Sequence, residues 1–158
     1  MDGRDRLESH LRENGVAFEV QEHPTAYTAQ KIAASEHVPG RMFAKVVMAS
    51  TDGDLVMLVL PAPSVVDVAK LSEVLGKQVR LASESEFASA FPDCQAGAMP
   101  PFGNLYDVPV YVDQALGQNE RIVFQAGTHT VTMSVAYADF ERLARPTVAE
   151  IAVTRRRT

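Results

Sequence analysis

Two apolar runs in the first half of the chain constrain the fold most. Residues 42–49 (MFAKVVMA) and 55–60 (LVMLVL) have the length and residue types of β-strands, and they are joined through Thr51-Asp52-Gly53-Asp54. Asp-Gly between two apolar runs is a strong signal for the tight turn of an antiparallel hairpin. The sequence therefore predicts a hairpin over these residues.

Other periodic segments predict helices and strands on both sides of this hairpin. Helices are expected at 4–14, 28–37, from a cap formed by Ser64 with Asp67 to Leu75, at 84–91 behind a Ser83/Glu86 capping box, at 139–144, and after a last capping box of Thr147 with Glu150. Further strands are expected at 16–20, 79–82, 108–112, 121–125 and 130–135. Helices and strands alternate at first and then give way to strands. This order favours an α+β fold with a mixed, strongly curved, partly barrel-like sheet flanked by helices.

Composition indicates one soluble domain. The 158 residues are 46% hydrophobic and contain no Ser/Gly-rich linker or repeat, so we expect a single domain over 1–158 with a flexible tail at 153–158. The polar N-terminus is unlike a signal peptide, and the longest apolar run, 55–62, is much shorter than a membrane helix. Cys94 is the single cysteine, which excludes an internal disulfide. Cytoplasmic location and no membrane association are the expectations.

Charge argues against nonspecific binding to duplex DNA. The chain carries 15 basic and 20 acidic side chains, a net charge of −5, and without Arg155 to Arg157 the remainder carries −8. Nonspecific DNA affinity comes mainly from many basic side chains that neutralise phosphates. We therefore expect no DNA partner, whereas a local basic site for an RNA end stays compatible with this charge.

Several common catalytic motifs are absent from the sequence. It contains no GxSxG, P-loop, GxGxxG or HExxH pattern, and its four histidines, His10, His23, His37 and His129, show no metal-ligand spacing. Cys94 has no base near it in the sequence, so it is interpreted as a structural or exposed thiol. We expect neither a metal nor a cofactor.

Three segments are candidates for chemistry. Lys45 interrupts an apolar strand, so it either lies exposed at an edge or points into a cavity that holds an anion. The segment from Gly97 to Gly103 (GAMPPFG) is either a plain connection or a stiff loop whose backbone N–H groups approach a ligand. The link Gly127-Thr128-His129 between two predicted strands is either an ordinary turn or part of the same site.

The order and spacing of these segments resemble the YbaK/prolyl-tRNA-synthetase-associated editing domain family. The features that carry the resemblance are His23-Pro24, the strand lysine Lys45, the GxxxP loop Gly97–Pro101, the turn Ala126-Gly127-Thr128 and Asp139-Phe140. Together they cover roughly residues 16 to 153. The resemblance implies the fold of that family and a free-standing aminoacyl-tRNA deacylase, which hydrolyses the ester of a mischarged tRNA. Binding sites separate small amino acids poorly, so a second hydrolytic site is useful.

The resemblance also implies roles for particular residues. Lys45, Gly97 and Pro101 would be catalytic, with the lysine on a phosphate or the terminal ribose and the loop amides on the ester carbonyl. Water, helped by a substrate hydroxyl, would attack without metal or covalent nucleophile. Residues implied to contact substrate are Met99, Pro100, Gly103, Gly127, Thr128, His129, Asp139 and His23. Tyr27, Phe43 and Phe102 are candidates for stacking on RNA bases.

Substrate and partner follow from the same resemblance. The expected substrate is tRNA-Pro carrying alanine or cysteine, or another small amino acid. The expected partner is a prolyl-tRNA synthetase, beside which this separate chain would act in trans. Ala126-Gly127 replaces the Gly-Gly of the cysteine-specific branch, which leaves the choice of amino acid open. A noncatalytic module that binds aminoacyl-tRNA or RNA ends is the alternative, and a small-molecule esterase is disfavoured because no nucleophile elbow is present.

Overall fold

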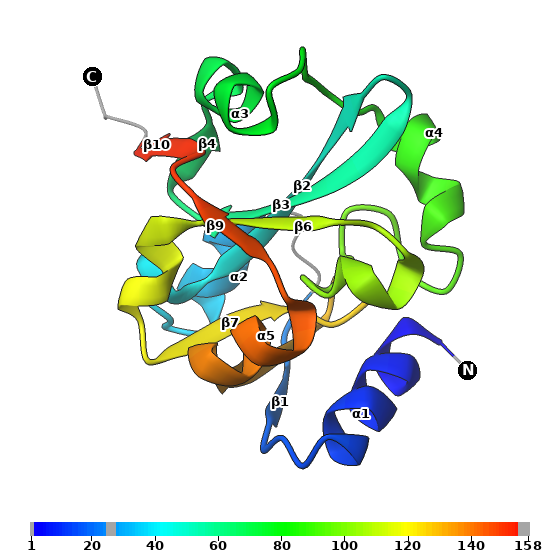
Figure 1. Cartoon of the computed structure of the whole chain (residues 1–158). Coiled ribbons are helices and arrows are strands. Elements are labelled where there is room, and N and C mark those ends of the chain that lie inside the picture. The colour runs from blue at the N-terminus through cyan, green and yellow to red at the C-terminus, as the bar shows by residue number, and fades with distance from the viewer. Residues whose placement is uncertain (1, 25–27, 155–158) are drawn as a thin grey trace.

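The predicted hairpin forms the middle of the largest sheet. In a computed structural model that describes residues 2–24 and 28–154, β2 (Ala44–Thr51) pairs with β3 (Asp54–Pro61) in antiparallel register along its whole length (Figure 1). Asp52 and Gly53 have φ of 52° and 83°, the pair of left-handed residues that a type I′ turn requires. The hairpin prediction is confirmed.

Three strands extend this hairpin into a mixed sheet. Its order is β5-β2-β3-β6-β9, with β5 at Arg80–Leu81, β6 at Val110–Asp113 and β9 at Thr147–Ala149. The pairs β2/β3 and β2/β5 are antiparallel, whereas β3/β6 and β6/β9 are parallel. The mixed character that we predicted is therefore present.

The remaining strands form two smaller sheets, so the barrel-like prediction is wrong. One sheet has the order β1-β8-β7, with β1 at Glu19–Glu22, β7 at Arg121–Gln125 and β8 at Val131–Ala136, and the other pairs β4 (Ser64–Val66) with β10 (Ala152–Thr154). No sheet formed by the described residues closes on itself. The reason is that β7 meets β2 through one isolated parallel bridge, Phe43 to Val123, instead of a continuous ladder.

Helices cover these sheets on different sides. They are α1 (Gly3–Glu13), α2 (Ala29–Ser35), α3 (Val68–Leu75), α4 (Glu84–Phe87) and α5 (Tyr137–Ala144), with 3-10 turns at Gly40–Met42, Ala88–Ala90, Gly103–Tyr106 and Gln114–Gln118. Among the described residues, no helix is long and apolar enough to cross a membrane. The chain thus has a mixed α+β fold with short helices packed on its sheets.

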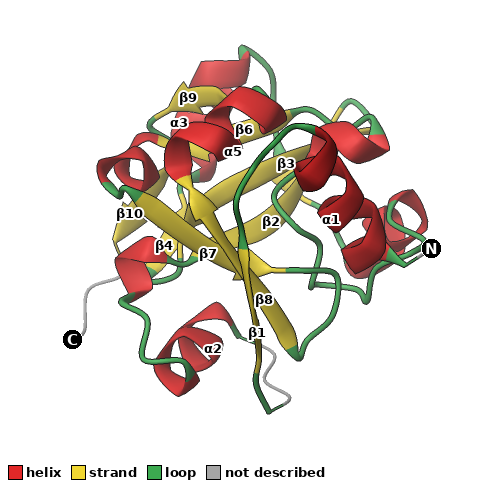
Figure 2. Cartoon of the chain, turned by 90° about the horizontal axis from the view of Figure 1, so that it is seen from below, coloured by secondary structure: helices red, strands yellow, loops and turns green. Residues whose placement is uncertain are grey.

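The apolar core is divided among these helices. Leu7 and Leu11 of α1 and Phe140 of α5 pack in the largest cluster, whereas Leu71 of α3 packs in a second cluster against β3. A third, smaller cluster joins Ile32 of α2 to its neighbours on β7 and the start of β2. Figure 2 shows α2 beside the β1-β8-β7 sheet and well separated from α1. The position of α2 therefore depends on few apolar contacts.

Several expected element boundaries differ in the structure. Asp67 caps α3 by accepting a hydrogen bond from the Lys70 N–H, whereas Ser64 lies in β4, so only one of the two expected capping residues is confirmed. Thr147 begins the strand β9 instead of capping a helix, because residues 147–149 pair with β6. Residues 153 and 154, expected in a tail, belong to β10, and residues 155–158 lie outside the described part of the chain.

Candidate active site

Lys45 lines a cavity beside α2. Its Nζ donates to the carbonyl oxygen of Ala62 at 3.1 Å, and Gln30 Nε2 donates to the same oxygen at 3.5 Å. The cavity has a volume of about 350 Å³ and is lined by Thr28, Ala29, Gln30, Lys31, Lys45, Ala62, Pro63, Ser64 and Val65. The ammonium of Lys45 thus reaches a concave, partly polar space, as an anion-binding role requires.

The glycine of the expected GxxxP loop makes a tight turn. Ala98 N–H donates to Gln95 O at 3.0 Å, and Gly97 at the third position of this turn has φ of 83°. A positive φ at that position is the requirement of a type II turn and favours glycine. Gly97 is exposed in this turn, whereas Ala98 and Met99 are buried.

This turn is bonded to the segment 126–129, which was a separate candidate in the sequence. Gln95 N–H donates to Gly127 O at 2.8 Å, and Gly127 N–H donates to Ala98 O at 2.9 Å. His129 adds two contacts: its N–H donates to Gln95 Oε1 at 2.8 Å and its Nε2 lies 2.9 Å from Ala96 O. A carbonyl oxygen only accepts, so Nε2 carries the hydrogen. The two candidate segments therefore form one unit, which we call the loop pair (residues 95–101 and 126–129).

The N-terminus of α1 packs against this unit. A Cβ at Gly127, where φ is 93°, would lie 3.3 Å from Arg4 N and 3.4 Å from Gly3 C. Glycine is needed here for both its conformation and its small size. Thr128 is half-buried beside it, and its Oγ1 accepts from Thr130 N–H at 3.2 Å.

Adjoining strands carry Lys45 and the loop pair. The parallel bridge from Phe43 to Val123 sets β2 and β7 side by side in the same direction. Lys45 and Gln125 each stand two residues beyond this bridge, so they leave their strands on the same face. Because β7 ends at Gln125 and β2 begins at Ala44, the end of β7 lies beside the start of β2, and the loop pair follows β7 next to the strand position of Lys45.

His23 is buried instead of facing a cavity. Its side chain is 2% exposed, Nδ1 lies 2.8 Å from Pro24 O, and Nε2 lies 3.9 Å from Glu36 Oε2. The backbone N–H of His23 donates to Thr130 O at 2.9 Å, which attaches this residue to the strand that follows the loop pair.

Other expected site residues lie in the core or elsewhere. Met99, Pro100 and Pro101 are buried, and a Cβ on Gly103 would lie 2.7 Å from Val108 O, so Gly103 serves close packing. Asp139 accepts from Arg142 at 3.2 Å, and Arg142 also donates to Asn14 O at the far end of α1. Because α1 is about 16 Å long, Asp139 is well removed from the loop pair.

Two of the three aromatic residues expected to stack on bases are unavailable. Phe43 and Phe102 are 0% exposed, and the Phe102 ring packs edge-on against Phe124 with centroids 5.6 Å apart. Tyr27 lies outside the described residues. The structure therefore contradicts base stacking on Phe43 and Phe102.

Cys94 and the histidines do not form an obvious reactive centre. Burial raises the pKa of the Cys94 thiol to about 11, which disfavours the thiolate nucleophile at neutral pH. The described residues contain no group of three or more His, Cys, Asp or Glu side chains placed to hold a metal ion.

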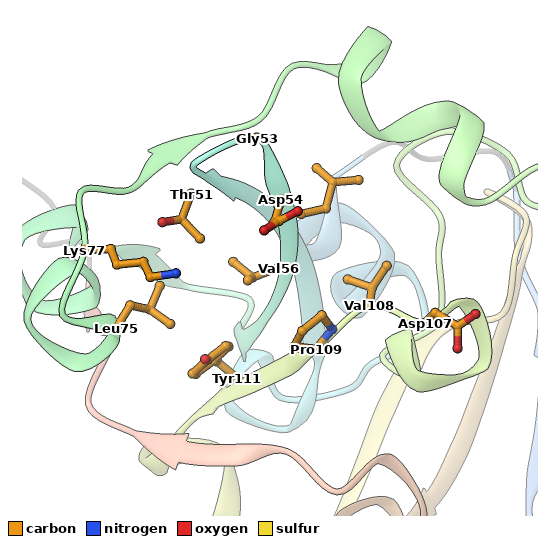
Figure 3. Close-up of a pocket in the computed structure, with 11 residues that line it drawn as sticks. Thr51, Gly53, Asp54, Val56, Leu75, Lys77, Asp107, Val108, Pro109 and Tyr111 are labelled. Atoms are coloured by element: carbon orange, nitrogen blue, oxygen red, sulfur yellow. The ribbon is translucent and has the colours of Figure 1, made fainter.

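A second cavity lies at the opposite end of the hairpin. It has a volume of about 560 Å³, and Figure 3 shows the ammonium of Lys77 pointing into it and Tyr111 on its floor. It is separated from Lys45 by the length of β2, since Thr51 lines it and Lys45 is near the other end of that strand. Lys77 is therefore a suitable control lysine for experiments on Lys45.

Sequence reasoning missed three buried polar residues, Glu36, Gln125 and Thr132. Glu36 accepts from the Thr132 hydroxyl. Gln125 is 9% exposed, and its Oε1 makes no hydrogen bond within the described residues. Gln125 interrupts an apolar strand as Lys45 does, and that signal could have identified it. Glu36 sits in a polar stretch of sequence and gives no comparable signal.

Comparison with known proteins identifies the family of the chain. Residues 23–143 match the aminoacyl-tRNA editing domain family. That match spans most of the chain, and it includes Lys45 and the loop pair. The chain belongs to the aminoacyl-tRNA editing domain family. A search of curated proteins found no match.

Solved structures share the fold at low sequence identity. A candidate trans-editing enzyme for prolyl-tRNA synthetase is 19% identical with a TM-score of 0.84, over 96% of this chain and 97% of that one. The hypothetical protein APE2540 is 17% identical with a TM-score of 0.85, over 94% and 99%. A candidate signal transduction protein from Marinobacter aquaeolei VT8 is 16% identical with a TM-score of 0.75, and this chain covers 30% of it. These likenesses establish a mixed α+β fold of the editing-domain type.

Proposed function

We propose that this protein is an aminoacyl-tRNA deacylase that hydrolyses the ester bond of a mischarged tRNA. The observation that carries the proposal is the hydrogen-bonded loop pair, which follows the end of β7 where that strand lies beside the start of β2 and Lys45. Family membership supports the same reaction class.

The loop from Gly97 to Pro101 supplies donors for the ester carbonyl. Pro100 and Pro101 have no N–H, and the Ala98 N–H is used within the turn. The N–H groups of Gly97 and Met99 make no hydrogen bond to other described residues, so they are the donors that can meet an oxyanion. Fixed backbone donors of this kind stabilise the charge that develops as water attacks.

Lys45 supplies the charge that holds the RNA end. Its ammonium is directed by the Ala62 carbonyl oxygen into the cavity, where Lys31 contributes a second cationic side chain. We infer that these lysines bind the terminal phosphate or ribose and leave the aminoacyl ester facing the loop pair. Water, helped by a ribose hydroxyl of the substrate, is the proposed nucleophile.

The proposed substrate is tRNA-Pro carrying alanine, cysteine or another small amino acid. Support comes from similarity to the candidate trans-editing enzyme for prolyl-tRNA synthetase, which this chain covers over 97% of its length. The same similarity supports action in trans beside a prolyl-tRNA synthetase. His129, which contacts Gln95 and Ala96 in the loop pair, and Thr128 are the residues proposed to border the amino-acid pocket.

A panel of charged tRNAs tests this proposal. Purified protein is incubated with tRNA-Pro carrying alanine, cysteine, serine or proline, and loss of the aminoacyl bond is followed against buffer. We expect selective hydrolysis of one mischarged species and little hydrolysis of the prolyl form. Binding of these tRNAs without faster hydrolysis would contradict the enzyme and favour a noncatalytic module that holds aminoacyl-tRNA.

A further inference from the structure

A buried polar cluster attaches α2 to the neighbouring sheet. Glu36, which follows the last residue of α2, has a side chain only 1% exposed, and the Thr132 hydroxyl of β8 lies 2.9 Å and 2.8 Å from its two carboxylate oxygens. His23 completes the group, with Nε2 3.9 Å from Glu36 Oε2. We call His23, Glu36 and Thr132 the buried cluster.

The buried cluster is poorly satisfied. A hydroxyl has one hydrogen, so Thr132 serves one carboxylate oxygen at a time. His23 Nδ1 faces the carbonyl oxygen of Pro24, which only accepts, so Nδ1 carries a hydrogen. His23 Nε2 is buried and makes no hydrogen bond with the described residues. Buried charged groups with incomplete partners cost stability, and apolar replacements of similar volume are often neutral or stabilising.

Few other charged side chains lie near Glu36. The small cavity beside Glu36 has a volume of about 170 Å³, and Glu19 of β1 is the other titratable residue that lines it. Arg121 of β7 is held nearby by Ser134, to which it donates at 3.0 Å. The hydrogen bonds of Arg121 go to Ser134, and Glu19 is itself acidic, so neither residue pairs with the Glu36 carboxylate.

The buried cluster does not add stability, but it can fix the position of α2. With seven residues, α2 is too short to be stable alone, and its apolar residues Ile32 and Ala33 provide contacts that have no direction. The Glu36 to Thr132 hydrogen bond adds a directional contact at one end of α2, and the His23 N–H to Thr130 O bond holds the chain before it.

We propose that Glu36 is a positioning residue for the Lys45 cavity. By binding Thr132 it fixes α2 on β8, and α2 in turn places Thr28, Gln30 and Lys31 on the wall of that cavity. This inference rests on the proposed function for its effect on catalysis, while the placement of α2 can be measured without any substrate. His23 assists through the same cluster and, being buried, does not touch the substrate.

The test replaces the polar contact with apolar groups. In the double variant Glu36→Leu with Thr132→Val, we expect the melting temperature to stay or to rise by a few degrees (~2–6 °C). We expect kcat/KM for the mischarged tRNA to fall by roughly tenfold to a hundredfold, mainly through a higher KM, because the cavity wall is displaced. Hydrogen exchange at the Lys31 and Ile32 amides, which bond to the Thr28 cap, should become faster.

Thr51→Val is the matched control. It removes a buried hydroxyl that donates to Gln78 O at 3.1 Å at the other end of β2, so it should lower the melting temperature and leave kcat/KM unchanged. If the double variant does not fold, Glu36→Gln is measured instead, and faster exchange at Lys31 and Ile32 is again expected.

Unchanged amide exchange together with kcat/KM within a factor of about two of the wild type would overturn the positioning role. If the wild-type protein hydrolyses none of the charged tRNAs, the proposed function fails on its own, and amide exchange still decides whether Glu36 positions α2.

Discussion

At the residue scale, Gly127 is the point where three segments meet. Its N–H and C=O join the two halves of the loop pair, and its missing side chain leaves room for the backbone of Gly3 and Arg4. A residue with a side chain would crowd this backbone and would disfavour the positive φ of Gly127. Gly127 therefore links the candidate active site to the end of α1 through backbone contacts alone.

Gly127→Ala separates conformational cost from crowding when it is compared with Gly15→Ala. Both glycines have positive φ, 93° and 69°, but a Cβ at Gly15 would meet nothing within 4 Å. We expect Gly15→Ala to lower the free energy of unfolding by about 1 kcal/mol and Gly127→Ala by ~2–4 kcal/mol. Urea denaturation measures both values. Equal losses would mean that α1 does not press on the loop pair.

At the element scale, Asp113 holds the last strand against the large sheet. It ends β6, is 4% exposed, and its Oδ1 accepts from Ile151 N–H at 2.9 Å and from Ala152 N–H at 3.1 Å. Its Oδ2 accepts from Ala115 N–H at 3.1 Å. One carboxylate thus ties a 3-10 turn and the start of β10 to β6.

Asp113→Ala should cost far more than removal of an ordinary helix cap. Three N–H groups, one of them buried and two part-buried, would lose their carboxylate acceptor, so we expect a loss of ~3–5 kcal/mol in the free energy of unfolding. Asp67→Ala, which removes the cap of α3, should cost about 1 kcal/mol. Chemical denaturation of the two variants provides the comparison, and similar losses would show that Asp113 does not anchor β10.

Local sequence signals predicted the elements that are decided locally. The Asp-Gly hairpin, the helix near the N-terminus and the Ser83/Glu86 capping box all depend on residues close in sequence, and all three are present. The cap predicted at Thr147 is absent because pairing with β6, which is far away in the sequence, determines the conformation of this residue. A capping pattern does not reveal such a partner.

At the scale of the whole molecule, the site is assembled by contacts between distant segments. Its parts were identified separately in the sequence, but their union depends on the Gly127 to Ala98 bond and on the Phe43 to Val123 bridge. Periodicity in the sequence does not reveal these two contacts, and it does not reveal whether the sheets close into a barrel. The resemblance to a family supplied the grouping of the site, whereas spacing alone left each segment with an ordinary interpretation.

The protein as a whole is acidic, so its proposed RNA substrate must be held locally. With a net charge of −5, a general electrostatic attraction to tRNA is excluded as the main source of affinity. We therefore expect binding of the proposed substrate to depend strongly on Lys45, which lines its cavity and donates to Ala62 O.

The most direct measurement is the single-turnover rate of deacylation of alanyl-tRNA-Pro by the wild type, Lys45→Ala and Lys77→Ala. Lys77 lines the other cavity, so its removal makes the same change in total charge away from the proposed site. We predict that Lys45→Ala slows hydrolysis on the order of a hundredfold and Lys77→Ala leaves it unchanged. Equal rates for the wild type and both variants would contradict the assignment of the active site.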